Sequence, residues 1–285
     1  MSSFFSSALL LVLLFMTSLM AASALRFDRN VEFYWGGQFA NVQSGKAVTM
    51  SLYNSGGCGF QSYDGFLFGR FDMRIKLVPG NSAGTVTTYY ISSSGPYHDE
   101  VDMEFLGNVT GQPYILHTNI FSNGVGGREQ QFSLWFDPTL KFHKYSFIWN
   151  RQLILLLVDN KAVRIFNNNE AIGVPFPNSQ AMNVYSSIWC GDSWATEGGR
   201  IKTNWADAPF TASFRNLKAN ACKVSYGSTS CGSSTPLWQP VTLNDTIKKQ
   251  LARAQNKHMI YNYCTDYARF PQGFPPECYR PQFYQ

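Results

Sequence analysis

Residues 98–107 carry the clearest structural signal in this chain, and they read His98-Asp-Glu-Val-Asp-Met-Glu-Phe-Leu-Gly107. Three carboxyl residues alternate there with three apolar residues, and a period of two is typical of a β-strand. The six are Glu100, Asp102 and Glu104, and Val101, Met103 and Phe105. Because successive side chains of a strand point to opposite faces, the carboxyls share one face and the apolar side chains pack behind it.

Three acids on one strand face repel each other, and a fold keeps them only where the carboxyls are needed. Cleavage of a glycosidic bond needs two carboxyls in different protonation states. A solvated acidic face is the ordinary alternative. A hard cation site is another, although such a cation prefers about six oxygens or more from a flexible loop. The chain holds 23 Phe, 15 Tyr and 7 Trp, and aromatic faces bind sugars. The composition therefore favours catalysis on a polysaccharide, with no cofactor and no metal.

Length and composition indicate an all-β protein. A chain of 285 residues could form one large β domain or two smaller ones. Apolar residues make up 45% of it and charged residues 14%, against the usual quarter for charged residues. The net charge of +5 is not concentrated in a run of Lys and Arg. It argues weakly for loose retention on an acidic polymer and against nucleic acid, which requires a dense basic stripe.

The first residues predict a secretory signal peptide. An apolar run from Ala8 to Met16 is followed by small residues and by Ala22-Ser-Ala24, with cleavage expected after Ala24. A membrane anchor is the alternative, but this run is shorter than the roughly 20 residues that span a bilayer. We therefore expect residues 1–24 to be removed, and the protein to be secreted and independent of a membrane.

Six cysteines in a secreted chain predict disulfides, and six cysteines allow about 15 pairings. Pairing in sequence order, Cys222 with Cys231 and Cys264 with Cys278, would close two short loops that have little core of their own. Cys58 and Cys190 stand apart, either as free thiols or as a further pair. Sequons begin at Asn108 and at Asn244, and Asn108 follows the acidic strand where a turn would expose it for glycosylation.

Short apolar or alternating runs separated by Gly, Asn and Pro predict many antiparallel strands. The runs are 66–78, 85–92, 130–136, 145–149, 153–158 and 163–166, with a hairpin turn at 158–162. This pattern favours a β-sandwich or jelly roll over residues 25–220. Residues 221–285 read as an extension packed on that domain, with a helix capped by Asn244 or Asp245. We expect Ile247, Leu251, Ala254 and Tyr261 on one face of that helix.

The acidic stretch and a series of further motifs resemble the xyloglucan endotransglucosylase/hydrolase family. The further motifs are Tyr114-Ile-Leu-His-Thr-Asn119, Arg128-Glu-Gln-Gln-Phe132, Leu134-Trp-Phe-Asp-Pro138, Val158-Asp-Asn160, Gly173-Val-Pro-Phe-Pro177, Trp194-Ala-Thr196, Ala208-Pro-Phe-Thr211 and Tyr261-Asn-Tyr-Cys-Thr265. The resemblance covers nearly the whole mature chain. It implies a concanavalin-like β-jelly roll of glycoside hydrolase family sixteen. It also implies a monomer in the plant cell wall and apoplast, with xyloglucan chains as donor and acceptor.

Residue by residue, the resemblance makes Glu100 the nucleophile, Glu104 the general acid/base and Asp102 a helper between them. It places sugar contacts at His117, Thr118, Asn119, Gly127, Arg128, Glu129, Ser193, Trp194, Gly198 and Arg269. A retaining mechanism requires carboxyls about 5–5.5 Å apart. The Cα atoms of Glu100 and Glu104 should lie roughly 13 Å apart on a strand. The two side chains must therefore lean toward each other over Asp102.

Some positions depart from the family pattern. Met103 stands where an aromatic residue is usual, and Ser193 where an Asp is common, which puts that sugar contact in doubt. Glu197 stands where a basic residue is expected. Three functions therefore compete: an endotransglucosylase, an endohydrolase with water as the acceptor, and a lectin-like wall-binding protein. The intact set of three carboxyls argues against the lectin, which would need no such set.

Overall fold

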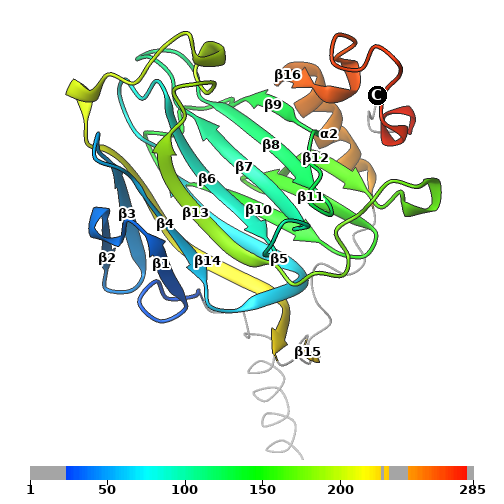
Figure 1. Cartoon of the computed structure of the whole chain (residues 1–285), viewed down its shortest axis with the longest axis horizontal. Helices are drawn as coiled ribbons and strands as arrows, with labels where there is room; N and C mark the ends of the chain where they lie inside the picture. The colour runs from blue at the N-terminus through cyan, green and yellow to red at the C-terminus, as the bar shows by residue number, and fades with distance from the viewer. Residues whose placement is uncertain (1–23, 226–227, 231–242, 281–285) are drawn as a thin grey trace, which may run out of the picture.

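The computed structural model describes residues 24–225, 228–230 and 243–280. Two antiparallel sheets pack face to face around one core, which confirms the predicted all-β sandwich (Figure 1). The predicted signal peptide, except Ala24, lies outside the described residues. Within the described part of the chain, no helix is long and apolar enough to span a membrane.

The first sheet, here called the cleft sheet, carries the acidic strand in its middle. Its strands, in spatial order, are β1 (Val31–Trp35), β4 (Cys58–Ser62), β13 (Asn183–Cys190), β6 (Thr85–Ser92), β7 (Glu100–Leu106), β8 (Ile115–Phe121), β9 (Gln130–Ser133) and β16 (Met259–Asn262). The alternation read from the sequence holds in β7, where Val101, Met103 and Phe105 are fully buried against the second sheet.

The second sheet, here called the back sheet, packs behind it. Its strands, in spatial order, are β12 (Lys161–Asn167), β11 (Leu153–Val158), β10 (His143–Trp149), β5 (Gly65–Lys76), β14 (Phe210–Ser225), β3 (Ala47–Leu52) and β2 (Ala40–Gln43), with β15 (Ser228–Ser230) paired to β14. Buried aromatic side chains fill the space between the sheets, as where Phe105 meets Tyr145 at 4.6 Å between ring centroids. The aromatic content of the chain thus serves the core as well as the cleft.

Short 3₁₀ turns lie between strands at η1 (Gly37–Phe39), η2 (Glu170–Ile172), η3 (Glu197–Gly199) and η4 (Trp205–Asp207). Two more, η5 (Tyr263–Thr265) and η6 (Pro276–Tyr279), follow the last strand. Strands 85–92 and 153–158 are confirmed to the residue, and the other predicted strands are confirmed with shifted ends. The hairpin between β11 and β12 is also confirmed. Its turn residues Asp159 and Asn160 have φ of 48° and 63°, as the twist of a tight hairpin requires.

The extension contains the expected helix, α2 (Asp245–Lys257), and Asn244 caps it by accepting a hydrogen bond from Ile247 N at 3.0 Å. Leu251 and Ala254 of the predicted face are buried, and Ile247 is half-buried against the same core. The prediction for Tyr261 is wrong, because the helix ends before it and Tyr261 lies in β16, paired to Gln131 of β9. Strand β14 also continues past residue 220, where we expected the extension to begin.

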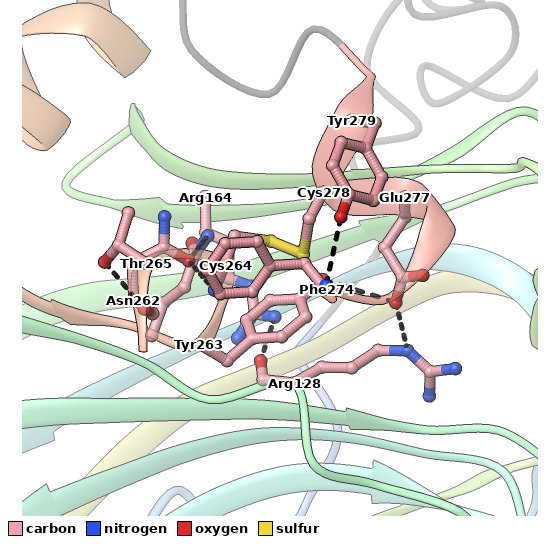
Figure 2. Close-up of a disulfide and its surroundings, with 11 residues drawn as sticks. Arg128, Arg164, Asn262, Tyr263, Cys264, Thr265, Phe274, Glu277, Cys278 and Tyr279 are labelled. Carbon is pink, nitrogen blue, oxygen red and sulfur yellow. Dashed lines mark hydrogen bonds and ion pairs between the residues drawn. A yellow bond between two sulfur atoms is a disulfide. The ribbon is translucent and has the colours of Figure 1, made fainter. Parts of the chain in front are cut away.

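The structure tests part of the predicted disulfide pairing. Cys264 and Cys278 form the predicted disulfide, which closes the end of the extension (Figure 2). Cys222 is disulfide-bonded, but Cys231 lies outside the described residues, so their pairing with each other stays a prediction. Cys58 and Cys190 are free thiols, which settles the alternative that the sequence left open.

Candidate active site

The three carboxyls of β7 lie together on the outer face of the cleft sheet. They line a cleft of about 290 Å³, together with side chains from β6, β8 and β13. Glu100 and Glu104 are half-buried, whereas Asp102 between them is 7% exposed. The strand alternation therefore places all three where a ligand could reach the outer two.

The pairing of neighbouring strands aligns further side chains with the carboxyls, in rows that cross the sheet. One row runs through neighbouring strands from Ser187 and Thr88 to Glu104, His117, Gln131 and Tyr261. The adjacent row contains Tyr185, Tyr90, Asp102 and Asn119. A linear polymer laid across the strands would meet these side chains in turn. Strand β16 lengthens the first row, so the extension forms part of the same surface.

Burial and mutual repulsion change the protonation of the carboxyls. Burial, followed by the charge of Glu100, raises the pKa of Glu104 to about 7. Burial also raises the pKa of Asp102 well above its ordinary value, and the charges of Glu100 and Glu104 add to this. Asp102 shares a hydrogen bond with Glu100, and its raised pKa makes Asp102 the donor. The cleft thus holds two neighbouring carboxyls that keep their protons to a higher pH than free carboxyls do.

His117 faces Glu104 from the neighbouring strand. Its Nε2 lies 3.7 Å from Glu104 Oε2, and burial lowers the pKa of His117 to about 4. Gln131 Nε2 lies 2.9 Å from His117 Nδ1. Because an amide nitrogen only donates, Nδ1 accepts, and the neutral ring carries its proton on Nε2, toward Glu104. The structure therefore brings His117 into the carboxyl cluster.

Aromatic side chains flank the carboxyls on the side of β6 and β13. Tyr90 and Tyr185 stack at 4.9 Å between centroids with 11° between their planes, and Tyr34 meets Tyr185 edge-on at 5.9 Å. Trp189 lines the cleft and lies 6.1 Å from Trp194. The sequence prediction missed Tyr90 and Trp189. A signal for Trp189 was present in the sequence, because it alternates along one strand with Tyr185 and Ser187.

The predicted sugar contacts fall in four places, of which only the first is at the carboxyls. His117, Asn119 and Trp194 lie at the cluster, with Trp194 5.5 Å from the His117 ring. Ser193 and Gly198 are exposed on the same loop as Trp194.

Three further predicted contacts lie close together: Gly127, Glu129 and Arg269, the last of which belongs to the extension. Arg269 Nη1 donates to Glu129 Oε2 at 2.5 Å. Gly127 has φ +85°, and an added Cβ there would lie 3.1 Å from Arg269 Nη2.

Thr118 and Arg128 point elsewhere. Thr118 is fully buried on the opposite face of β8, where its Oγ1 donates to Gln130 O at 2.8 Å and accepts from Arg164 Nη1 at 2.7 Å. The guanidinium of Arg128 is also buried, and its Nε donates to Glu277 Oε1 at 2.9 Å (Figure 2). These two side chains hold the cleft wall and the extension in place and do not reach the cleft.

A larger hollow of about 380 Å³ lies at the end of β7, beside Asn108. It contains a single carboxyl, Asp137, so it lacks the pair that glycosidic cleavage needs. Among the described residues, no group of three His, Cys, Asp or Glu could hold a metal ion. The chemistry that the residues can support therefore lies at the carboxyls of β7.

Known proteins resemble the chain over most of its length. The description "Glycosyl hydrolases family 16" matches residues 27–207, and "Xyloglucan endo-transglycosylase (XET) C-terminus" matches residues 232–278. "Xyloglucan endotransglucosylase protein 1" of Diospyros kaki is 50% identical over 96% of this chain and 95% of its own length. "Probable xyloglucan endotransglucosylase/hydrolase protein 16" of Arabidopsis thaliana is 50% identical, with 98% of both chains covered.

Solved structures share the fold. A Bacillus licheniformis β-glucanase superposes with a TM-score of 0.56 at 20% identity, covering 70% of this chain and 98% of its own. A prokaryotic β-1,3-1,4-glucanase (lichenase) from a mouse hindgut metagenome superposes with a TM-score of 0.55 at 23% identity. The match covers 68% of this chain and 95% of the lichenase chain.

Proposed function

The chain belongs to the xyloglucan endotransglucosylase/hydrolase family within glycosyl hydrolase family 16, and from this premise we propose that it is a retaining endotransglucosylase. It cleaves the β-1,4-glucan backbone of xyloglucan and transfers the fragment to a second xyloglucan chain. The observation that carries this proposal is the cluster of three carboxyls in one cleft, with the pKa of Glu104 raised to about 7.

Glu100 is the proposed nucleophile. Its carboxylate attacks the anomeric carbon and forms a glycosyl ester, while Glu104 gives its proton to the leaving oxygen. A pKa of about 7 supports the acid role, because Glu104 is mostly protonated at mildly acidic pH and half protonated at neutral pH. Asp102 supports the nucleophile by donating its hydrogen bond to Glu100.

The second half of the reaction needs Glu104 as a base. The position of Glu104 beside Glu100 allows this change from acid to base. The charge of Glu100 contributes to the raised pKa of Glu104. Ester formation removes that charge, so the pKa of Glu104 falls once the intermediate exists. Glu104 can then accept the proton from the hydroxyl of the incoming chain.

The flanking side chains supply binding surfaces on both sides of the carboxyls. On one side, the stacked rings of Tyr90 and Tyr185 offer apolar faces to sugar rings. On the other side, the row continues through His117 and Gln131 to Tyr261 of the extension, with Glu129 and Arg269 beside it. An acceptor chain held there would shield the ester from water, which favours transfer over hydrolysis.

The proposed setting follows from the same family. The chain is secreted after removal of residues 1–24, carries a glycan on Asn108, and acts as a monomer in the plant cell wall and apoplast. Asn108 is half-buried beside an open hollow of about 380 Å³, which leaves room for a glycan.

A transfer assay tests the proposed function. The enzyme is incubated with long xyloglucan, with and without a labelled xyloglucan oligosaccharide, and polymer size, label and new reducing ends are followed. We expect the label to enter long products and the polymer to shorten faster when the oligosaccharide is present. Equal release of reducing ends with and without it, and no label in polymer, would identify a hydrolase instead. Glu100→Ala is the inactive control.

A further inference from the structure

Three cationic side chains stand side by side on the outward face of the back sheet. Lys144 of β10 pairs with Arg74 of β5, and Arg74 pairs with Arg215 of β14. The alternating inward residues Met73 and Ile75 are fully buried, so the cations point away from the core. They also point away from the cleft, because the cleft sheet lies on the other side of that core (Figure 1).

This arrangement is unfavourable for folding alone. Like charges directly opposite each other on paired strands repel and destabilise a sheet. The nearby carboxylate of Asp72 compensates the row only in part. Arg70 lies 2.9 Å from it and Ser146 2.5 Å, whereas Lys144 Nζ is 3.9 Å away. Within the described residues, neither Arg74 nor Arg215 forms an ion pair.

Two more cations extend the row into a surface. Lys76 follows Arg74 on β5, and Lys218 follows Arg215 on β14, both on the outward face and both without an ion pair among the described residues. The guanidinium of Arg215 lies 3.9 Å from the centroid of the Phe142 ring, which fixes its plane. The five residues Arg74, Lys76, Lys144, Arg215 and Lys218 are called the basic face below.

We propose that the basic face binds an acidic polysaccharide, a linear polyuronate, at a site separate from the cleft. Four of its five cations have no ion pair among the described residues, and Lys144 shares the carboxylate of Asp72 with Arg70. Carboxylates of a ligand would compensate the excess positive charge. Binding there would hold the enzyme on an acidic polymer while the cleft handles its own neutral substrate.

The geometry favours a polyuronate over other polyanions. The row crosses three adjacent strands about 4.8 Å apart, so its charges repeat on the scale of one sugar unit in an extended chain. A polyuronate carries one carboxylate on each unit, and a guanidinium can hold a carboxylate through two parallel hydrogen bonds. A single-stranded nucleic acid would need aromatic side chains for base stacking. Phe142 beside the face is already covered by Arg215.

Binding should depend on several cations together, because each exposed ion pair contributes little and is screened by salt. The test therefore neutralises the whole row in a triple variant, Arg74→Gln, Lys144→Gln and Arg215→Gln. The matched control, Lys248→Gln, Lys249→Gln and Arg253→Gln, removes the same charge from helix α2. Calorimetry and affinity electrophoresis at low salt use polygalacturonate, its fully methyl-esterified form and single-stranded DNA as probes.

We expect the wild type to bind polygalacturonate and not the methyl ester. The triple variant should bind about tenfold more weakly or worse, since several exposed pairs together exceed one decade of affinity. It should keep its transfer rate on soluble xyloglucan and melt no lower than the wild type, because the repulsion within the row is removed. The α2 control should keep the wild-type affinity. Equal losses in both variants, unchanged binding in the triple variant, or equally tight binding of DNA would overturn the proposal.

Discussion

His117 Nε2 lies 3.7 Å from Glu104 Oε2, at directly paired positions of β8 and β7. Burial moves the two groups in opposite directions, lowering the pKa of His117 to about 4 and raising that of Glu104 to about 7. Between these values the histidine is neutral and the carboxyl is protonated, so the pair carries no net charge. This is the state in which Glu104 can act as an acid.

The first prediction concerns the pH dependence of transfer. The rate should be nearly constant as pH rises from about 4 toward 7, and should then fall as Glu104 loses its proton. Loss of one essential proton gives a fall of about tenfold per pH unit. The measurement is kcat/KM for labelled-acceptor transfer across this range. A rate that is flat through pH 7 and above would exclude Glu104 as the acid.

The second prediction concerns stability. The folded state holds the proton of Glu104 up to about pH 7, whereas the unfolded chain loses it near the ordinary value of 4.5. The folded state therefore binds more protons between these values, and stability falls as pH rises through this window. Glu104→Gln removes the effect, and should be more stable than wild type above pH 7 by up to about 3 kcal/mol.

Denaturant unfolding at both ends of the window checks this. The variant and the wild type should differ less in stability at pH 4.5 than above pH 7, while the variant transfers poorly at every pH. A difference in the free energy of unfolding that does not change with pH would contradict the raised pKa of Glu104, because only a titrating carboxyl makes that difference depend on pH.

The third prediction concerns the ion pair that joins the extension to the cleft sheet. Arg128 and Glu277 are both buried and form an ion pair (Figure 2). Arg128 N also donates to Asn119 Oδ1 at 2.9 Å, in the wall of the cleft. Removing one partner of a buried pair leaves the other charge uncompensated, at a cost of roughly 3–5 kcal/mol. Glu277→Gln should therefore lower the free energy of unfolding strongly.

The double variant Arg128→Met, Glu277→Met is the informative control. It removes both charges, and should cost less than the sum of the two single changes. Chemical denaturation measures the free energy of unfolding of each variant. If the loss in the double variant equals the sum of the losses in the two single variants, the two side chains do not act as a pair.

The fourth prediction separates acceptor binding from bond cleavage. Arg269 pairs with Glu129 at the end of the row that passes through Glu104 and Tyr261. If the acceptor lies there, Arg269→Ala should raise the KM for oligosaccharide acceptor about tenfold, the effect of losing one charged hydrogen bond. Slow hydrolysis without acceptor should not change. Lys257→Ala, another cation of the extension, should leave both unchanged, whereas equal losses of transfer and hydrolysis would place Arg269 at the cleavage step.

The sequence is informative where the determining contacts are local. The alternation of Glu100, Asp102 and Glu104 predicted a strand and one shared face, and both hold because side-chain direction in a strand is a property of neighbouring residues. The Cys264–Cys278 loop and the cap at Asn244 are equally local. Strand β16 could not be predicted in the same way, because its pairing with β9 joins residues more than a hundred positions apart.

The same alternation could have corrected the predicted sugar contacts. His117, Thr118 and Asn119 are consecutive on a strand, so they cannot all face the cleft, and Thr118 is the one that points inward. Arg128 is different, because its burial depends on Glu277, which comes from the extension. Nothing near Arg128 in the sequence indicates that partner.

The central claim is that transfer proceeds through a covalent ester on Glu100. The most direct test is to incubate the enzyme with xyloglucan, quench it in acid, digest it, and map glycosylated peptides by mass spectrometry. The account predicts a glycosyl adduct on Glu100, in the peptide that spans β7, that disappears when an acceptor oligosaccharide is added before the quench. An adduct on Asp102 or Glu104, or an active enzyme bearing Glu100→Ala, would contradict it.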